Sequence, residues 1–180
     1  MSANILFILN PTQAQISTLN TFTDNNWGES IHEGDTTAQF FATPDSLVEL
    51  FVDDVLVSGM QFFFRKLEFN EKQYRFFGIG GVVTHVEYRH RGFATQVLNK
   101  AIERFHKDFD FAMLCTDVDR LGTLYGRVGF VSLDRPYYFV DKNGIEQSET
   151  GGMIAPLSSP LAVRQILKTS DKIFVGVSNF

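Results

Sequence analysis

The stretch GGVVTHVEYRHRGFATQVLNKAIERF, residues 80–105, decides the fold of this 180-residue chain. It begins with an apolar run that is typical of a buried strand. Apolar side chains then recur every three or four positions, which predicts an amphipathic helix over residues 92–107. Between the two runs the chain gathers two arginines, a histidine and a glycine, at residues 89–92. The stretch therefore predicts a strand, a charged turn and a helix in succession.

The charged turn is suited to binding an anion such as a pyrophosphate. The first turn of a helix exposes backbone N–H groups and the positive end of the helix dipole. Gly92 has no side chain to hold a ligand away from the backbone, and the small Ala94 leaves the approach open. Arg89 and Arg91 add formal positive charge. We expect an anion site here; the alternative is that basic residues simply precede a helix.

The strand before the turn contains Gly78, Gly80 and Gly81. Glycines in a strand often mark a bulge, or a close approach of another backbone or a ligand. A ligand lying along this strand would take hydrogen bonds from the main chain of residues 82–84. A bulge without a ligand is the alternative.

Apolar periodicity and turn residues predict the remaining elements. These are a strand at 4–10, a helix from Pro11 to about Phe22, an exposed loop or broken helix at 23–37, a hairpin around Asp53-Asp54, a strand after a Glu71-Lys72 turn, a buried strand at 110–116, a helix from Asp119 stopped by Gly129, a closing strand pair at 137–141 and 151–157, and an ordered tail from Pro160 to Phe180. Strand and helix alternate across 76–130, which predicts parallel neighbours, whereas hairpins predict antiparallel ones. We therefore predict an α/β (α+β) fold with a mixed, mostly antiparallel central sheet flanked by helices, in a single domain over residues 1–180.

Charge is distributed unevenly along the chain, whose formal net charge is −5. All 16 lysines and arginines lie at or beyond Arg65, whereas the first 64 residues contain eight acidic side chains. A solvated acidic face is the plainer interpretation. The functional one is that the N-terminal part faces a cation while the rest faces an anion. The acidic balance disfavours nucleic-acid binding.

Composition also argues against other classes of site. Cys115 is the only cysteine, so no internal disulfide is expected, and its apolar surroundings predict a core residue in a reducing compartment. The four histidines show no metal-ligand spacing, so we expect no metal site. No apolar run reaches about 18 residues and the N-terminus has no basic lead. We therefore expect no membrane span and no signal peptide, and a cytoplasmic protein.

A second motif, LYGRVGF at residues 124–130, contains Tyr125. A neutral phenol, whose ordinary pKa is about 10, could protonate a leaving group; a core or surface tyrosine is the alternative.

The two motifs together resemble those of the Gcn5-related N-acetyltransferase (GNAT) superfamily. Its pattern Gln/Arg-x-x-Gly-x-Gly/Ala is matched by Arg89, Gly92 and Ala94, and its pattern Leu-Tyr-x-x-x-Gly-Phe by Leu124, Tyr125, Gly129 and Phe130. The resemblance covers residues 76–131, the motif core.

This resemblance implies acetyl-coenzyme A as co-substrate and direct transfer of its acetyl group to a neutral amine. In the family the turn holds the coenzyme A pyrophosphate on backbone amides, which here belong to Arg89, His90, Arg91, Gly92, Phe93, Ala94 and Thr95. The pantetheine arm pairs like an extra strand with Val82, Val83 and Thr84. The tyrosine matched by Tyr125 is the general acid that protonates the departing thiolate, and a strand amide near Val82 would stabilise the oxyanion.

The resemblance leaves the general base unassigned. Many relatives carry an acid in the middle of the strand, where this chain has Gly80 and Gly81. Many also have an asparagine seven residues before the tyrosine, where this chain has Val118. Asp117 and His85 are the candidate bases, and a structural or solvated role is the alternative for each.

The layout of the C-terminal third is loosely similar to that of aminoglycoside 2′-N-acetyltransferases, including an aromatic residue in the tail, here Phe180. Such enzymes present acids and a terminal carboxylate to a polycationic sugar. We therefore expect residues 11–45 to face a small cationic acceptor with a primary amine: aminoglycoside-like, an amino sugar or a polyamine, with basic peptide termini also open. The alternative is an acyl-coenzyme A-binding sensing or scaffold module with little transferase activity. A homodimer is compatible with either.

Overall fold

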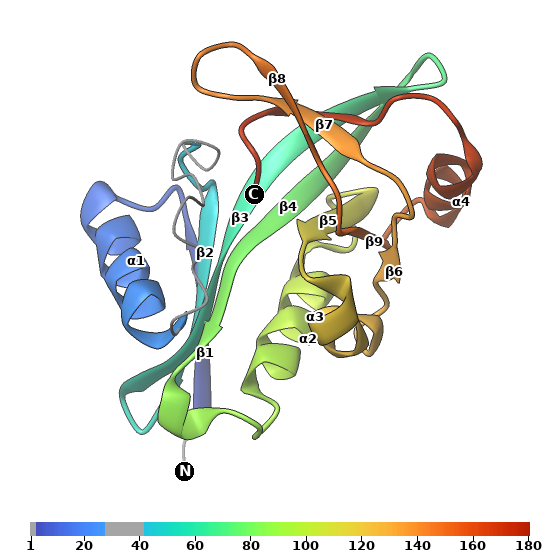
Figure 1. The fold of residues 1–180 in the computed structure, drawn as a ribbon. Coiled ribbons are helices and arrows are strands. Elements are labelled where there is room, and N and C mark those ends of the chain that lie inside the picture. Colours follow the sequence, from blue (N-terminus) through green and yellow to red (C-terminus); the bar gives the residue numbers. More distant parts are fainter. Residues whose placement is uncertain (1–2, 28–41) are drawn as a thin grey trace.

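The computed structural model describes residues 3–27 and 42–180 and is shown in Figure 1. Within these residues the strands form a seven-stranded sheet of order β1-β2-β3-β4-β5-β9-β6 and a three-stranded sheet of order β10-β7-β8. The elements are β1 (Ala3–Leu9), α1 (Gln13–Trp27), β2 (Ser46–Val52), β3 (Val55–Phe69), β4 (Lys72–Thr84), the 3-10 turn η1 (Val86–Tyr88), α2 (Phe93–Phe105), β5 (Phe111–Cys115), α3 (Val118–Gly126), β6 (Val131–Ser132), β7 (Tyr137–Val140), β8 (Glu146–Glu149), β9 (Gly152–Pro156), α4 (Pro160–Lys168) and β10 (Phe174–Val177). The predicted mixed, mostly antiparallel α/β fold is confirmed.

The first four strands form an antiparallel meander whose last two turns use left-handed residues. Asp53 and Asp54, between β2 and β3, have φ of 47° and 66°. Asn70 and Glu71, between β3 and β4, have φ of 50° and 59°. Such two-residue turns match the twist of the flanking strands. The predicted hairpin at Asp53-Asp54 is confirmed, whereas the next turn lies one position earlier than predicted because Lys72 already pairs in the β3–β4 ladder.

Strands β4 and β5 are parallel and are joined through α2, which confirms the predicted strand, turn and helix. Their pairing covers residues 76–79 of β4 and 111–114 of β5. Beyond residue 79, β4 continues to Thr84 with β3 as its only partner strand among the described residues. The two parallel strands therefore share a ladder at one end and separate at the other (Figure 1). We call this separation the β4–β5 split.

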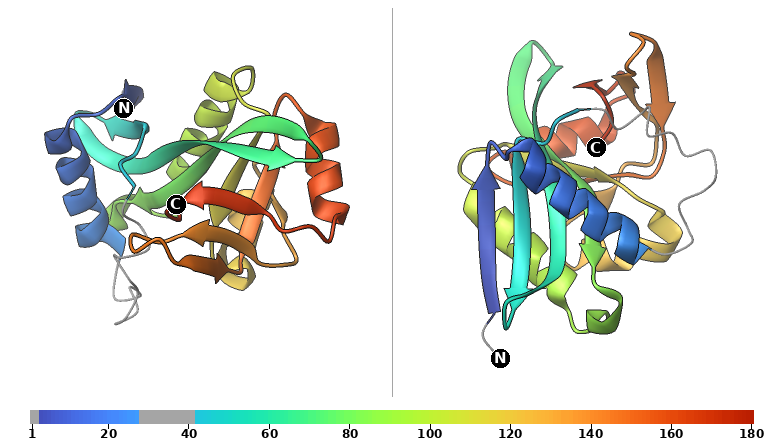
Figure 2. Two further views of the ribbon diagram at one scale, coloured as in Figure 1. Left: turned by 90° about the horizontal axis from the view of Figure 1, so that it is seen from above. Right: turned by 90° about the vertical axis from the view of Figure 1, so that its left-hand side faces the viewer.

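Helices cover both faces of the large sheet. Figure 2 shows α1 crossing the strands on one face, with α2 on the opposite face. The core on the α2 and α3 side is rich in phenylalanine: the Phe62 ring lies 5.3 Å from Phe77 and 5.7 Å from Phe105. Such tilted and edge-to-face ring pairs stabilise a core beyond simple burial. On the other face, α1 covers the N-terminal strands, and the small sheet and α4 cover the remainder.

One strand pairing predicted for the C-terminal half is wrong. Segments 137–141 and 151–157 do not pair with each other: β7 pairs with β8 and β10, whereas β9 lies between β5 and β6. Residues 152–155 of β9 are all buried, as an interior strand requires. In addition, α3 ends at Gly126, before Gly129. The reason is that the N–H groups of Val128 and Gly129 bond carbonyls three residues back, which tightens the helix end into a turn.

Helix α1 runs to Trp27, beyond the predicted end at Phe22. The first part of the stretch predicted as a loop or broken helix is therefore helical, and the rest, with His32, lies outside the described residues. In the part of the chain that the structure describes, no helix is long and apolar enough to span a membrane.

The tail predicted to be ordered is confirmed, since it forms α4 and β10 and brings Phe180 against the centre of β4. The Phe180 ring stacks on Tyr137 with centroids 5.8 Å apart. A Cβ added to Gly78 would lie 2.4 Å from that ring, and one added to Gly80 would lie 2.9 Å from the main-chain carbon of Phe180. Both glycines are therefore required by the close approach of the tail.

We expect Gly78→Ala to lower the free energy of unfolding by about 1–3 kcal/mol, because the new methyl group overlaps the Phe180 ring. Urea denaturation measures the change. Gly126→Ala is the matched control, since a Cβ there would meet nothing within 4 Å, and it should be neutral or slightly stabilising. Equal stability of the two variants would contradict the contact.

Candidate functional site

A β-bulge interrupts β4 where the β4–β5 split begins. On the β3 side, Met60 alone lies opposite Gly81 and Val82. Gly81 has φ of 59°, a left-handed conformation that glycine adopts without strain. The predicted bulge is thus confirmed at Gly81, whereas the neighbouring glycines at 78 and 80 accommodate Phe180.

The main chain beyond the bulge is fixed from the β3 side and is not paired with β5. The buried Ser58 hydroxyl donates to the carbonyl of Val83 at 2.7 Å and lies 3.1 Å from the hydroxyl of Thr84. On the opposite edge, pairing with β5 has already stopped at residue 79. An extended ligand can add to such an edge as a further strand. The geometry therefore suits the role expected for Val82, Val83 and Thr84.

The turn between β4 and α2 presents an open helix N-terminus. His90 and Gly92 have φ of 62° and 80°, and Gly92 is the N-cap of α2 without any side-chain capping hydrogen bond. A Cβ at Gly92 would meet nothing within 4 Å. The N–H groups of Phe93, Ala94 and Thr95 lie in the first helical turn, where no intrahelical carbonyl is available to them. These residues fit a pyrophosphate, which would be bound by backbone amides and by the helix dipole.

The two arginines of the turn make contacts that the sequence did not reveal. Arg89 donates from Nε to the Thr84 carbonyl at 3.3 Å, and from Nη2 to the Asn26 carbonyl at the end of α1. Arg91 donates to the Glu87 carbonyl at 3.1 Å, and its guanidinium lies 5.2 Å from the centre of the Tyr88 ring. Both arginines therefore contribute positive charge at the turn, and their hydrogen bonds also fix the conformation of the turn.

Tyr125 lies on α3, which follows β5, and so stands on the β5 side of the split. It is buried, with 6% of its surface exposed, and its ring packs edge-on against Phe130 at 6.2 Å. Burial raises its pKa to about 12, because the phenolate would lose its hydration; a hydrogen bond with the Thr116 side chain opposes this rise. Tyr125 therefore keeps its proton at neutral pH, as a general acid must.

The two candidate bases both make local structural contacts. Asp117 is the N-cap of α3: its Oδ1 accepts from the Arg120 N–H at 3.1 Å, and its Oδ2 lies 3.9 Å from Arg120 Nε. His85 accepts from the Glu87 N–H at 3.3 Å, and its ring lies 6.3 Å from that of Phe22. Capping explains an aspartate at position 117 without catalysis. A role for either residue as base stays a prediction.

Sequence reasoning missed the residues that shape the site from a distance. Ser58 and Asn26 reach the motif core from distant parts of the chain and were not predicted; Phe180 was expected in an ordered tail, but its contact with β4 was indicated only by the cluster of glycines in that strand. Cys115 was expected in the core but is half-buried, because it is the last residue of β5; its Sγ donates to the Thr150 carbonyl at 3.2 Å. Among residues 3–27 and 42–180, no group of three His, Cys, Asp or Glu side chains is arranged to hold a metal.

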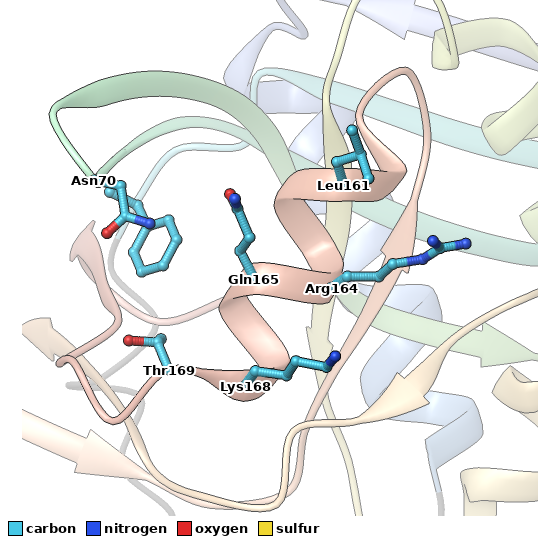
Figure 3. Close-up of a pocket in the computed structure, with 7 residues that line it drawn as sticks. Asn70, Leu161, Arg164, Gln165, Lys168 and Thr169 are labelled. Atoms are coloured by element: carbon cyan, nitrogen blue, oxygen red, sulfur yellow. The ribbon is translucent and has the colours of Figure 1, made fainter.

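A separate pocket of about 380 Å³ lies between the β3–β4 turn and α4 (Figure 3). Phe69 and Asn70 line it from the turn, and Leu161, Arg164 and Lys168 from α4. It shares no residue with the β4–β5 split, the charged turn or α3. The pocket is therefore not part of the candidate site.

Comparison with known proteins identifies the motif core. Residues 26–132 match the model of the acetyltransferase (GNAT) domain family. ElaA of Escherichia coli has the same fold, with a TM-score of 0.57 and 16% identity over 86% of this chain and 99% of ElaA. An aminoglycoside acetyltransferase, HMB0005, from an uncultured soil metagenomic sample gives a TM-score of 0.54 and 16% identity over 72% of this chain and 91% of its own. Eis1 of Mycobacterium abscessus gives 0.56 and 12% over 76% of this chain, which spans only 32% of Eis1. No curated protein sequence matches.

Paired substitutions at Asp117 separate capping from catalysis. Because asparagine caps a helix as well as aspartate does, Asp117→Asn should keep both stability and activity. Asp117→Ala should lower the free energy of unfolding by about 1 kcal/mol. Thermal unfolding and steady-state kinetics of the two variants test this. Loss of activity in the stable asparagine variant would instead assign Asp117 as the base.

Proposed function

The chain belongs to the GNAT acetyltransferase family and is an N-acetyltransferase; we propose that it moves the acetyl group of acetyl-coenzyme A directly to a primary amine of a small cationic acceptor. One arrangement carries the proposal. The open N-terminus of α2 follows the free edge of β4, where β4 has separated from β5. A buried, protonated Tyr125 lies on α3, the helix that follows β5. An anion site, an edge for an extended arm and an acid are the parts that thioester aminolysis requires.

Coenzyme binding uses the backbone of the motif core. The amides of residues 89–95 receive the pyrophosphate, favoured by the helix dipole and by the formal charges of Arg89 and Arg91. The main chain of Val82, Val83 and Thr84 pairs with the pantetheine arm, since this edge of β4 is not occupied by β5. The bulge at Gly81 shifts the pairing of these residues with β3 by one position.

The chemistry follows from the same groups. The acceptor must first lose a proton, because an ammonium has no lone pair. Its nitrogen then bonds the acetyl carbon as the carbon–sulfur bond breaks, with an amide near Val82 donating to the carbonyl oxygen. Tyr125 gives its proton to the sulfur and recovers one from solvent. The nitrogen loses a second proton as the neutral amide forms, and both protons of the amine leave through water or a protein base that is not yet assigned.

A cationic acceptor is favoured by charge. Neither the described α1 nor the rest of the first 64 residues contains a lysine or arginine, and this part of the chain holds eight acids. The segment 11–45 is proposed to face the acceptor. The fold shared with an aminoglycoside acetyltransferase makes an aminoglycoside-like amine one class to test, beside amino sugars, polyamines and basic peptide termini. A single domain over residues 1–180, a cytoplasmic location and a homodimer stay predictions.

An acyl-coenzyme A-binding module with little transfer activity is the second candidate. Glycines at positions 80 and 81, in place of a strand acid, favour it. Tyr125 argues against it, because a protein that only binds the coenzyme has no use for a buried phenol beside the split.

Tyr125→Phe should lower kcat by about 10²–10⁴-fold and leave coenzyme A affinity unchanged, because only the transferred proton is lost. Thiol release and calorimetric binding measure the two quantities. Tyr74→Phe, the same chemical change at the start of β4, is the control and should keep full activity. With a pKa of about 12, Tyr125 should also cause no loss of rate between pH 7 and 10. Full activity of Tyr125→Phe would contradict its role as acid.

A panel of amines tests the acceptor class. Acetylation of an aminoglycoside and a polyamine should be faster than acetylation of an apolar monoamine, and KM for the polycations should rise with salt because exposed charge is screened. Thiol release is the measurement. Coenzyme binding without turnover on any amine would favour the binding module, and equal rates across the panel would contradict a cationic acceptor.

A further inference from the structure

The end of α1 is fastened to the turn between β4 and α2 by a set of polar contacts. Arg89 donates to the main-chain carbonyls of Asn26 and Thr84. The Asn26 side chain accepts from the Val86 N–H at 3.1 Å and donates to the Phe22 carbonyl at 2.9 Å. We call these contacts of Asn26 and Arg89 the α1 latch.

On the α1 side, the polar contacts of the α1 latch are buried, because Asn26 is buried. Asn26 is buried, with 6% of its surface exposed, so each of its polar atoms requires a partner. The Phe22 ring adds an apolar contact with His85, at 6.3 Å. Breaking the latch would leave the Asn26 carbonyl without its charged donor, which costs more than losing an exposed hydrogen bond.

We infer that Arg89 is a positioning residue that couples coenzyme binding at the turn to the docking of α1. The inference rests on the proposed function, because it assumes that the turn binds the coenzyme phosphates. Arg89 belongs to the binding motif, yet its guanidinium points back to β4 and α1. A ligand that holds the amides of residues 90–95 thereby also holds Arg89 in place, and with it the last turn of α1.

The guanidinium geometry makes this coupling specific to arginine. Its planar fork donates from Nε and Nη2 to two carbonyls on different elements at once. A lysine keeps the charge but has a single ammonium on a flexible stem, so it cannot bridge Thr84 and Asn26 in the same way. Arg91 is a natural comparison, since its contacts stay within the turn, at Glu87 and Tyr88.

The coupling between coenzyme binding and the docking of α1 must act equally in both directions. If coenzyme binding stabilises the docked α1, a docked α1 must strengthen coenzyme binding by the same factor. Because α1 lies in the proposed acceptor-side segment, coenzyme binding would prepare the acceptor side before the amine arrives.

Hydrogen exchange tests the inference, with coenzyme A as the probe at saturating concentration. In the unsubstituted protein, coenzyme A should slow exchange of the amides in residues 20–27 by about fivefold or more, a typical allosteric factor. Arg89→Lys should lose this protection even at saturation. Arg91→Lys should keep it, whatever its effect on affinity. The KM for the amine should rise in Arg89→Lys more than in Arg91→Lys.

The outcomes separate the inference from the proposed function. Absence of coenzyme A binding to the unsubstituted protein would overturn the proposed function. Binding without protection of α1, or equal protection in Arg89→Lys, would overturn the latch and leave the function standing. If Arg89→Lys does not fold, Asn26→Ala replaces it: this variant removes the acceptor for the Val86 N–H, and reduced protection is again the supporting result.

Discussion

The structure depends on one constraint: β4 must leave β5 while staying paired with β3. The parallel ladder stops at residue 79, and the bulge at Gly81 places two residues of β4 opposite one of β3. A bulge with positive φ costs little only at glycine, so a single small residue permits the split. The edge for an extended arm and the exposed helix N-terminus of α2 both follow from where β4 goes after this point.

The diverging strand is held in place by distant parts of the chain. Phe180 lies over Gly78 and Gly80, Ser58 holds the Val83 carbonyl, and Arg89 joins Thr84 to α1. These contacts come from the face of the sheet opposite α2 and from the neighbouring strand, so other elements hold the free edge of β4 in place although β5 does not pair with it. A main chain that is already held in place favours ligand binding, because a flexible one would lose conformational entropy when the ligand binds.

Local patterns explain why much of the fold could be predicted. Periodicity identified α2 and β5, paired turn residues identified the β2–β3 hairpin, and motif spacing identified Gly92 and Tyr125. The prediction failed where partners are distant in sequence, because no local pattern says that 137–141 pairs with β8 and β10 and not with 151–157. Side-chain partners could not be predicted for the same reason: the sequence does not show that Asp117 caps α3 or that Arg89 donates to the carbonyls of Thr84 and Asn26, and the roles expected for both residues stay predictions.

The burial of Tyr125 makes its phenol a weaker proton donor than an exposed phenol is. A pKa of about 12 makes the phenol a weak acid toward an ordinary thiolate, whose conjugate acid has a pKa of about 8.5 in water. Desolvation, however, raises the pKa of every group that becomes an anion, so a thiolate that leaves beside Tyr125 and out of contact with water would also hold a proton more tightly than it does in water. Such a thiolate would be a better acceptor for the phenol proton as negative charge builds on sulfur. A better acid in water would need an exposed side chain, and exposure would admit the water that competes with the amine for the thioester.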